Sequence, residues 1–494
     1  MRSIDLKDNC PATAWDKTWP AYERVKTALG AFDGKSLHEL SKNFLVFPFE
    51  SARSDLVGRD KKFLFSLSNR DSAEPSFRTG NVMGFFSLND GTRMRITSRF
   101  DRGNKNVFLH YMLQKVCNVA VAPRTDSDED DLHDFLYYLF PSYLKAACRQ
   151  GVYRAYVTRE YNDANVRGPI GVARHIRFNV PFNGKIAYHT REYTADNNMT
   201  QLVRHTIEFI RGLEFGKNLL DNAADEDLRE DVESIEFATP SYSCGARRQI
   251  VAKNLRPVTH PYYTAYEPLR RLCLAILRQD RLRYGESDAE PIAGILFDGS
   301  ALWEEYLAAV FREYGVDITH SNNRSGGDGI RLFKHGGTYY PDFYRKGSVQ
   351  GKDGVVLDAK YKWLYTPDST SSAQVETEDD DKLDETQQSS KAFHYQRGDL
   401  FQMLAYMHCL PAQSAWLVSP FGMTKDNAKD PVVDPIGREA CGYGGKISIM
   451  ALPIWQYGEN DAYDAFSGFM ADMEKAFVEK VGETLKSQFA PNGK

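Results

Sequence analysis

The chain has 494 residues, with 62 Lys and Arg against 67 Asp and Glu, which gives a formal net charge of −5. Hydrophobic residues make up 42% of the chain and aromatic residues 13%. This is the composition of a folded globular protein, and it excludes wholly disordered, collagen-like and coiled-coil chains. The length predicts roughly three domains of about 150 residues. A charge this close to zero neither requires nor excludes a nucleic-acid partner, because a local basic patch is sufficient.

The sequence contains no signal for a membrane or for an oxidising compartment. No apolar run reaches the roughly 18 residues that span a bilayer, and the first residues lack the apolar stretch of a secretory signal. The seven cysteines are dispersed without a CxxC pair, which indicates reduced thiols and argues against a structural zinc site. We therefore expect a cytoplasmic protein with no membrane partner.

The first region, residues 1–148, is predicted to mix strands and helices and to serve as a partner-docking region. A strand is expected over 44–49, and a hairpin over 81–100 around an Asp90-Gly91 turn, because Asp-Gly tolerates positive φ. Helices are expected over 107–121 and 132–148. We expect the acidic run between these helices, 126–131, to be a solvated loop or a boundary.

The second region, residues 149–260, opens with a local excess of arginine over acidic residues. Two readings stay open: a patch that contacts phosphate or a partner, and a scattered charged surface. The arginines are Arg149, Arg154, Arg159, Arg167, Arg174 and Arg177.

The third region, residues 261–494, alternates helices and strands, which predicts a mixed sheet flanked by helices. The whole chain is therefore predicted to be an α/β protein, organised as several α+β domains. The polar, acidic segment 365–391 is expected to be a disordered insertion. The expected elements are a helix over 297–315, strands over 338–344 and 355–363, a helix over 399–410, strands over 414–421 and 446–454, and a final helix from about 459.

The strongest chemical pattern is a Pro-Asp pair followed by Asp-Ala-Lys. Side chains alternate along a strand, so Asp358 and Lys360 share a face, and Asp342 reaches that face if the two strands pair. Adjacent carboxylates repel one another unless a cation lies between them, and hard oxygen ligands suit Mg²⁺. Mg²⁺ would activate a water for attack on a phosphodiester while Lys360 orients that water. The alternative interpretation is that Asp358 and Lys360 form a buried ion pair with a structural role only.

Two helices carry further candidates. Glu304 borders the apolar arc of the 297–315 helix, where it is either a metal ligand or water positioner or a rim carboxylate in solvent, whereas Glu305 points away. Asp399, Gln402 and Tyr406 form one polar stripe on the 399–410 helix. This stripe is either the rim of the active site or a satisfied helix edge. The absence of a GxxxxGK(S/T) motif indicates that the chain does not itself hydrolyse a nucleotide.

With these motifs in place, the chain resembles McrC, the nuclease subunit of the McrBC modification-dependent restriction systems. The resemblance covers residues 78–454 and rests on segments that occur in a fixed order and spacing. These segments are 79–101, 161–203, 296–311, the PDF and LDAKYK nuclease motif, and 398–407.

The resemblance implies a PD-(D/E)xK restriction-endonuclease-like core in residues 261–494, with Asp342 and Asp358 as Mg²⁺ ligands and Lys360 as the assisting cation. Gln402 and Tyr406 resemble the Q-x-x-x-Y element of related nucleases, and Glu304 their helical glutamate. The implied partners are DNA carrying 5-methylcytosine and a hexameric McrB-like AAA+ GTPase, with the N-terminal half inserted into the ring. Two alternatives stay open: a non-catalytic activator of the ring, and a stand-alone restriction endonuclease.

Overall fold

The computed structural model describes most of the chain. The described residues are 3–11, 13–16, 18–52, 63–68, 75–88, 92–101, 106–119, 128–221, 225–278, 294–321, 329–335, 338–347, 354–366, 392–423, 430–442, 444–456 and 462–487. Within them the chain mixes helices with several mixed sheets, which confirms the predicted α+β multidomain class. Within the same residues, no helix is long and apolar enough to cross a membrane.

The chain divides into two units that do not follow the predicted boundaries at 148 and 260. Unit 1 combines Met1–Lys42, Ser54–Pro123 and Ile295–Lys494, and unit 2 combines Asn43–Arg53 and Arg124–Gly294. Most of the predicted N-terminal region therefore packs with the C-terminal region, and helix α3 (Val107–Cys117) lies against α11 (Gly299–Glu313). Such long-range packing leaves no mark on local composition, which is why the sequence did not indicate it.

The N-terminal part of unit 1 is built on a sheet in which β1, β7, β6 and β10 follow one another. The antiparallel pairing of β6 with β7 confirms the predicted hairpin, whose turn residues 89–91 lie outside the described residues. The elements of this part are β1 (Ser3–Lys7), β2 (Thr13–Ala14), α1 (Tyr22–Gly30), α2 (Leu37–Leu40), β4 (Phe65–Ser68), β5 (Ser76–Thr79), β6 (Val82–Ser87), β7 (Arg93–Thr97) and β10 (Gly294–Asp298).

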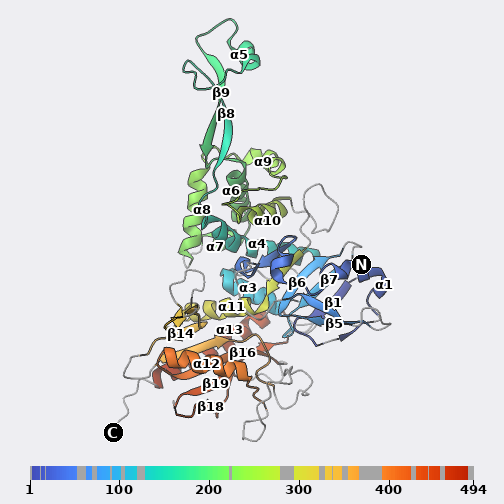
Figure 1. The fold of residues 1–494 in the computed structure, drawn as a ribbon, viewed down its shortest axis with the longest axis vertical. Helices are drawn as coiled ribbons and strands as arrows, with labels where there is room; N and C mark the ends of the chain where they lie inside the picture. Colours follow the sequence, from blue (N-terminus) through green and yellow to red (C-terminus); the bar gives the residue numbers. More distant parts are fainter. Residues whose placement is uncertain are drawn as a thin grey trace. The chain divides into compact units, whose positions relative to one another are not determined.

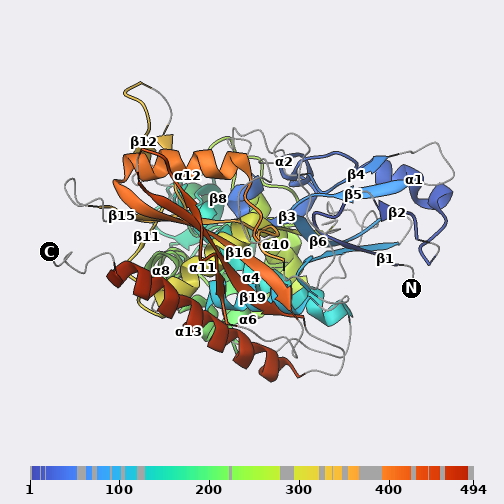
Figure 2. The same cartoon turned by 90° about the horizontal axis from the view of Figure 1, so that it is seen from below.

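The C-terminal part of unit 1 contains the predicted mixed sheet. Strands β15, β16 and β19 run parallel, and β14 joins β15 antiparallel. Figure 2 shows α12 and α13 on opposite faces of this sheet. Its elements are β11 (Thr319–His320), β12 (Ile330–Arg331), β13 (Thr338–Tyr339), β14 (Phe343–Arg345), β15 (Gly354–Ala359), α12 (Arg397–Cys409), β16 (Ala412–Met423), β17 (Val432–Val433), β18 (Arg438–Glu439), β19 (Lys446–Trp455) and α13 (Tyr463–Ser487).

Several predicted boundaries in this part change. The strand expected over 338–344 divides into β13 and β14 around Pro341, which has no N–H to donate to a ladder. The helix expected from 297 begins at Gly299, where the side chain of Asp298 accepts a hydrogen bond from the N–H of Ala301. The expected insertion begins too early at 365, because Tyr365 is buried and pairs with Phe393, and residues 367–391 lie outside the described residues.

Unit 2 is a helical body. The hydroxyl of Tyr143 on α4 bonds both the N–H and the carbonyl of Val46 in β3. Helix α4 begins at Asp128, so part of the acidic run expected as a loop is helical, in keeping with the preference of acidic residues for a helix N-terminus. The elements are β3 (Phe44–Phe47), η1 (Phe49–Ala52), α4 (Asp128–Cys148), α6 (Asn198–Arg211), α7 (Gly216–Leu220), α8 (Glu226–Ala238), η2 (Cys244–Ala246), α9 (Arg247–Lys253) and α10 (Tyr266–Arg278).

A two-stranded arm extends from this helical body (Figure 1). Strand β8 (Ala155–Asp163) pairs antiparallel with β9 (Ile186–Thr194), and α5 (Val172–Asn179) lies at the end of the hairpin. We call residues 155–194 the arm. Along β8 every side chain is either exposed or only half-buried, so this strand has no core face.

Candidate active site

The register of β14 and β15 brings the two predicted aspartates together. Phe343 pairs with Leu357, and one step further along this antiparallel ladder Asp342 lies beside Asp358. The Asp342 Oδ2 atom accepts a hydrogen bond of 2.7 Å from the N–H of Ala359. Asp358 is buried and Asp342 is half-buried. The hairpin geometry on which the prediction depended is therefore present.

The two carboxylates lie in an electrostatically unfavourable position. Removal from water, then the charges of Asp358 and Glu304, raise the pKa of Asp342 well above its ordinary value. Burial likewise raises the pKa of Asp358, although Lys360 opposes the shift. Each carboxylate makes it harder for the other to ionise, and a bound cation would remove that conflict.

Lys360 supplies the positive charge of the site. Its Nζ atom lies 2.5 Å from Asp358 Oδ2 and 3.6 Å from Asp399 Oδ1, and it donates a hydrogen bond of 3.1 Å to Gln402 Oε1. Burial acts to lower the pKa of Lys360, but the Asp358 and Asp399 carboxylates outweigh it and raise the pKa above its ordinary value. Lys360 is thus a fixed cation rather than a proton donor at neutral pH.

Helix α12 contributes the predicted polar stripe. Gln402 Nε2 donates to Asp358 Oδ1 at 3.4 Å and to the hydroxyl of Tyr406 at 3.2 Å. The hydroxyl of Tyr406 donates in turn to the carbonyl of Tyr340, two residues before Asp342, at 3.4 Å. The stripe therefore faces the aspartates and links the segment that carries Asp342 to strand β15.

Glu304 on α11 faces the same site, and its charge acts on both aspartates. Its Oε1 atom lies 2.9 Å from Nε2 of His320 on β11. No pattern in the sequence selects His320, because β11 has only two residues and shows no periodicity.

Lys362 is a further residue that the predicted set lacks. Its Nζ atom lies 2.7 Å from Asp399 Oδ2, and Asp399 also neighbours Lys360. Continued alternation from Asp358 through Lys360 was the signal that could have identified Lys362. Strand β15 ends at Ala359 rather than at the expected residue 363, yet the alternation of side chains continues, since Tyr361 is buried on the opposite side among Ser98 and Phe100.

The donor set fits a hard divalent cation held mainly through water. The described residues contain no group of three or more His, Cys, Asp or Glu side chains arranged around one point. Mg²⁺ does not need such a group, because it is usually held by one or two carboxylates and keeps several waters. Two adjacent carboxylates whose ionisation is mutually opposed match that requirement.

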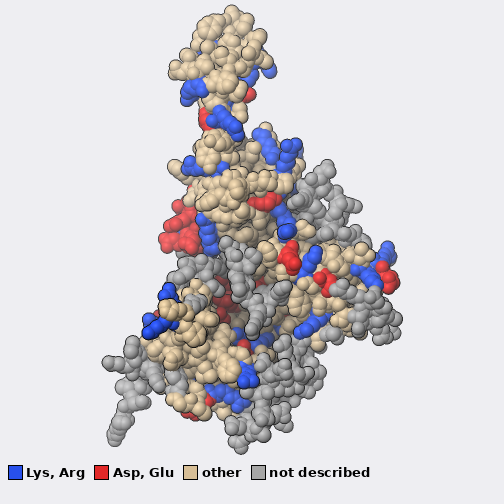
Figure 3. Space-filling view, in the orientation of Figure 1, with Lys and Arg blue, Asp and Glu red and all other residues tan. Residues whose placement is uncertain are grey.

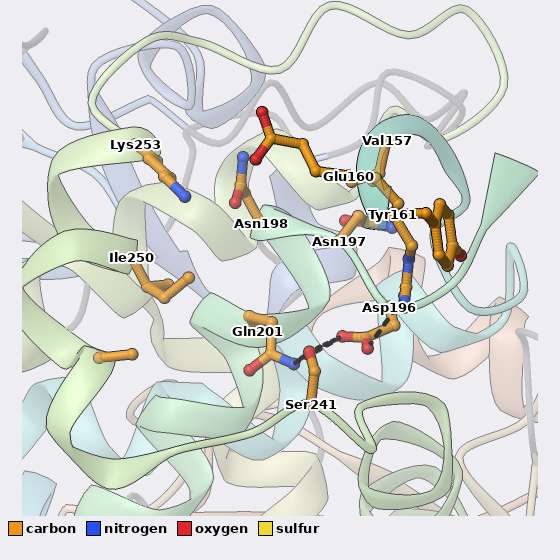
Figure 4. A pocket seen from close by; sticks show the side chains of 12 residues that line it. Val157, Glu160, Tyr161, Asp196, Asn197, Asn198, Gln201, Ser241, Ile250 and Lys253 are labelled. Carbon is orange, nitrogen blue, oxygen red and sulfur yellow. Dashed lines mark hydrogen bonds and ion pairs between the residues drawn. The ribbon is translucent and has the colours of Figure 1, made fainter. Parts of the chain in front are cut away.

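A second candidate site lies in unit 2, at the base of the arm (Figure 4). It is an open pocket of about 440 Å³ bordered by β8, α6 and α9. Asp196 Oδ1 accepts hydrogen bonds from Gln201 Nε2 at 2.6 Å and from Ser241 Oγ at 2.8 Å, and Arg159 lies 3.4 Å from Asp196 Oδ2. These polar groups hydrogen-bond to one another, so the pocket offers a weaker case for catalysis than the carboxylate site does.

Comparison with known proteins assigns the chain to a family. The family model described as "McrBC 5-methylcytosine restriction system component" matches residues 77–380, and no curated protein matches. A solved structure of Thermococcus gammatolerans McrB AAA+ hexamers with bound McrC is 15% identical at a TM-score of 0.41, covering 97% of this chain and 99% of that chain. A cryo-EM structure of the Thermococcus gammatolerans McrBC complex is 15% identical at a TM-score of 0.29, covering 64% of this chain and 89% of that chain.

At these TM-scores the structural likeness carries no argument, so the assignment rests on the family model. That model covers more than half of the chain and includes both Asp342 and Asp358. The resemblance identified from the motifs is confirmed: the chain belongs to the McrBC family of 5-methylcytosine restriction system components.

Proposed function

We propose that the chain is the McrC-type nuclease subunit of its restriction system and that it cuts DNA in a metal-dependent reaction. The observation that carries this proposal is the convergence of Asp342, Asp358 and Lys360 at one edge of a mixed sheet. Membership of a restriction-system family supports it, because such a system requires a component that cleaves phosphodiester bonds.

In this proposal Asp342 and Asp358 hold Mg²⁺, which would supply positive charge for the scissile phosphate and for the attacking water. Lys360 holds a fixed positive charge beside the aspartates and stabilises the negative charge that develops on phosphorus. Gln402 keeps the Lys360 ammonium and the Asp358 carboxylate in place by hydrogen bonding to both. Glu304, whose carboxylate lies 2.9 Å from Nε2 of His320, would orient a water.

We further propose that the arm docks in the central opening of a McrB-like AAA+ GTPase hexamer. Large apolar side chains are exposed around the end of the arm, where Figure 3 shows few charged atoms. Because these residues lie on the hairpin loops as well as on α5, a partner that encloses the arm from several sides would bury them best. They are Val166, Ile170, Val172, Ile176, Phe178, Val180 and Phe182.

The arginines of the arm support docking less than the apolar residues do. Arg159 lies 3.5 Å from Glu192, Arg167 lies 3.7 Å from Asp163, and Arg174 lies 3.3 Å from Glu160. These three charges are neutralised within the arm, which favours the scattered-surface reading of the predicted basic patch for them.

The test is cleavage of cytosine-methylated and unmethylated plasmid in Mg²⁺, with the chain alone or with its ring partner and GTP. We expect cutting only with methylation, partner and nucleotide together, and we expect the Asp358→Ala variant to lose cutting while it still stimulates the partner's GTPase. An Asp358→Ala variant that cuts at the wild-type rate would refute the site.

The same assay separates the two alternative functions. Cutting without partner or nucleotide would favour a stand-alone restriction endonuclease. Stimulation of the GTPase by a wild-type chain that never cuts methylated or unmethylated DNA would favour a non-catalytic activator.

A further inference from the structure

A buried polar cluster connects the first sheet of unit 1 to the segment that carries Lys360. At its centre is Arg99, just beyond β7, whose side chain is only 5% exposed. One terminal nitrogen of Arg99 lies 3.1 Å from Asp8 Oδ2, donates to the carbonyl of Tyr361 at 3.0 Å, and donates to Asn81 Oδ1. The guanidinium also lies over the Tyr361 ring, 5.0 Å from its centroid.

These contacts fix the backbone segment that follows the end of strand β15. Strand β15 ends at Ala359, and the N–H of Lys360 makes a last bond of 2.8 Å to the carbonyl of Val418. The carbonyl of Lys360 accepts a hydrogen bond of 2.9 Å from the N–H of Lys362, and the carbonyl after it, that of Tyr361, is the one that Arg99 binds. The hydroxyls of Tyr361 and Ser98 lie 2.7 Å apart, and the ring of Tyr361 packs against Gly299, where a Cβ would come within 2.7 Å.

The same cluster reaches α11, which carries Glu304. The carbonyl of Asn81 accepts a hydrogen bond of 3.0 Å from the N–H of Gly299, the first residue of that helix. The side chain of Asn81 is the group that Arg99 binds. Arg99 is therefore connected through one residue to the Lys360 segment and through another to the helix of Glu304.

We propose that Arg99 is a positioning residue of the nuclease site, which sets the placement of the Lys360 ammonium relative to Asp342 and Asp358. This inference rests on the proposed nuclease function. Its physical basis is that catalysis depends on placement to within a fraction of an ångström, and a displacement of about 1 Å costs up to 100-fold in rate. The terminal nitrogen of a guanidinium lies one bond farther from Cα than a lysine ammonium does, and the guanidinium plane also lies over the Tyr361 ring, so a lysine cannot reproduce this placement.

The test compares Arg99→Lys with the control Arg95→Lys in the full complex with ring partner, GTP, Mg²⁺ and methylated plasmid. Arg95 lies on β7, four residues before Arg99, and pairs with a β1 carboxylate, Asp5 at 2.7 Å. We measure single-turnover cleavage, because misfolding lowers the amplitude of product whereas misplacement lowers the rate constant. We expect Arg99→Lys to lower the rate constant at least 10-fold with amplitude and GTPase stimulation retained, and Arg95→Lys to leave the rate constant unchanged.

A wild-type rate constant in Arg99→Lys, or a loss confined to amplitude and melting temperature, would overturn the proposal. Tyr361→Phe and Ser98→Ala provide a second test, since each removes the contact between the two hydroxyls; Tyr361→Phe also removes a contact with Met83 Sδ, and Ser98→Ala an acceptor for the N–H of Phe100. We expect each to slow the rate constant several-fold and the double variant to be no slower than either; no change in any of the three would also overturn it. Failure of the nuclease function itself is recognised separately, by Asp358→Ala cutting normally.

Discussion

At the scale of single residues, the candidate site brings together the carboxylates of Glu304, Asp342 and Asp358, which repel one another when no cation lies between them. Burial is the first cause that raises the pKa of both aspartates, the charge of Glu304 adds to it, and Glu304 Oε1 lies 2.9 Å from Nε2 of His320. Such a cluster lowers the stability of the metal-free protein, and the proposed Mg²⁺ would remove that cost.

The Glu304→Gln variant tests this balance. We expect it to cut DNA roughly 100-fold more slowly, because the carboxylate that orients water is lost. We also expect the metal-free variant to melt at a higher temperature, because one of three mutually repelling carboxylates is removed. Glu305→Gln, at the next position of the same helix, should leave the rate of cutting unchanged. If Glu304→Gln cuts DNA at the wild-type rate, Glu304 is a solvent-exposed carboxylate at the rim of the site and does not orient water.

His110 on α3 gives unit 1 a specific sensitivity to acid. Burial lowers the pKa of His110 from 6.5 to about 4, so the folded chain holds this ring neutral. The stabilisation is complete above pH 6.5 and is lost as the pH falls toward 4, because only the unfolded chain takes up the proton readily. Between pH 8 and pH 5 the loss should be about 2 kcal/mol.

Denaturant unfolding of the wild type and of His110→Gln at these two pH values measures that loss. The wild type should lose about 2 kcal/mol more than the variant on acidification. Parallel pH dependence of the two proteins would show that His110 contributes nothing to it.

At the scale of elements, the helices and strands that could be predicted from the sequence are those with a buried face. The helix that carries Trp303 and Tyr306 was recognised because its apolar residues fall on one arc, and those side chains are buried. The pairing of Asp342 with Asp358 was predictable because both strands cross an apolar core. His320 and Arg99 were not, because their partners come from distant segments and a short strand carries no periodic signal.

The arm was not predicted, because its two strands lack such a buried face. Neither β8 nor β9 has a continuous buried face, so hydrophobic alternation gives no strand signal, and the paired carboxylate Glu192 lies on the strand that the arginine count did not include. An element that is stable while its apolar residues stay exposed is typical of a surface that binds a partner.

The Phe182→Ser variant tests the arm. Phe182 is 69% exposed, so the substitution should leave the melting temperature unchanged, while stimulation of the partner's GTPase and DNA cutting should both fall at least 10-fold. Phe237→Ser on α8 is the control, because that side chain is 91% exposed in the same unit but outside the arm. Equal behaviour of the two variants in the GTPase assay would contradict docking through the arm.

At the scale of the whole molecule, the proposed activities belong to different units. The carboxylate site and the Arg99 cluster lie in unit 1, and the arm lies in unit 2. In this proposal the covalent chain brings the nuclease site to the ring, because the residues assigned to cutting have no part in docking and the residues assigned to docking have no part in cutting.

This division predicts that two defective chains will not complement each other. Asp358→Ala retains the arm but not the site, and Phe182→Ser retains the site but not the arm. If cutting requires a docked chain with its own intact site, an equimolar mixture of the two with ring partner, GTP and methylated plasmid should cut no faster than the sum of the separate variants, although the GTPase should be stimulated by Asp358→Ala. Wild-type chain added to the same mixture checks that the assay still reports cutting. Cutting well above the sum would mean that the nuclease site acts from a chain that is not docked through its own arm.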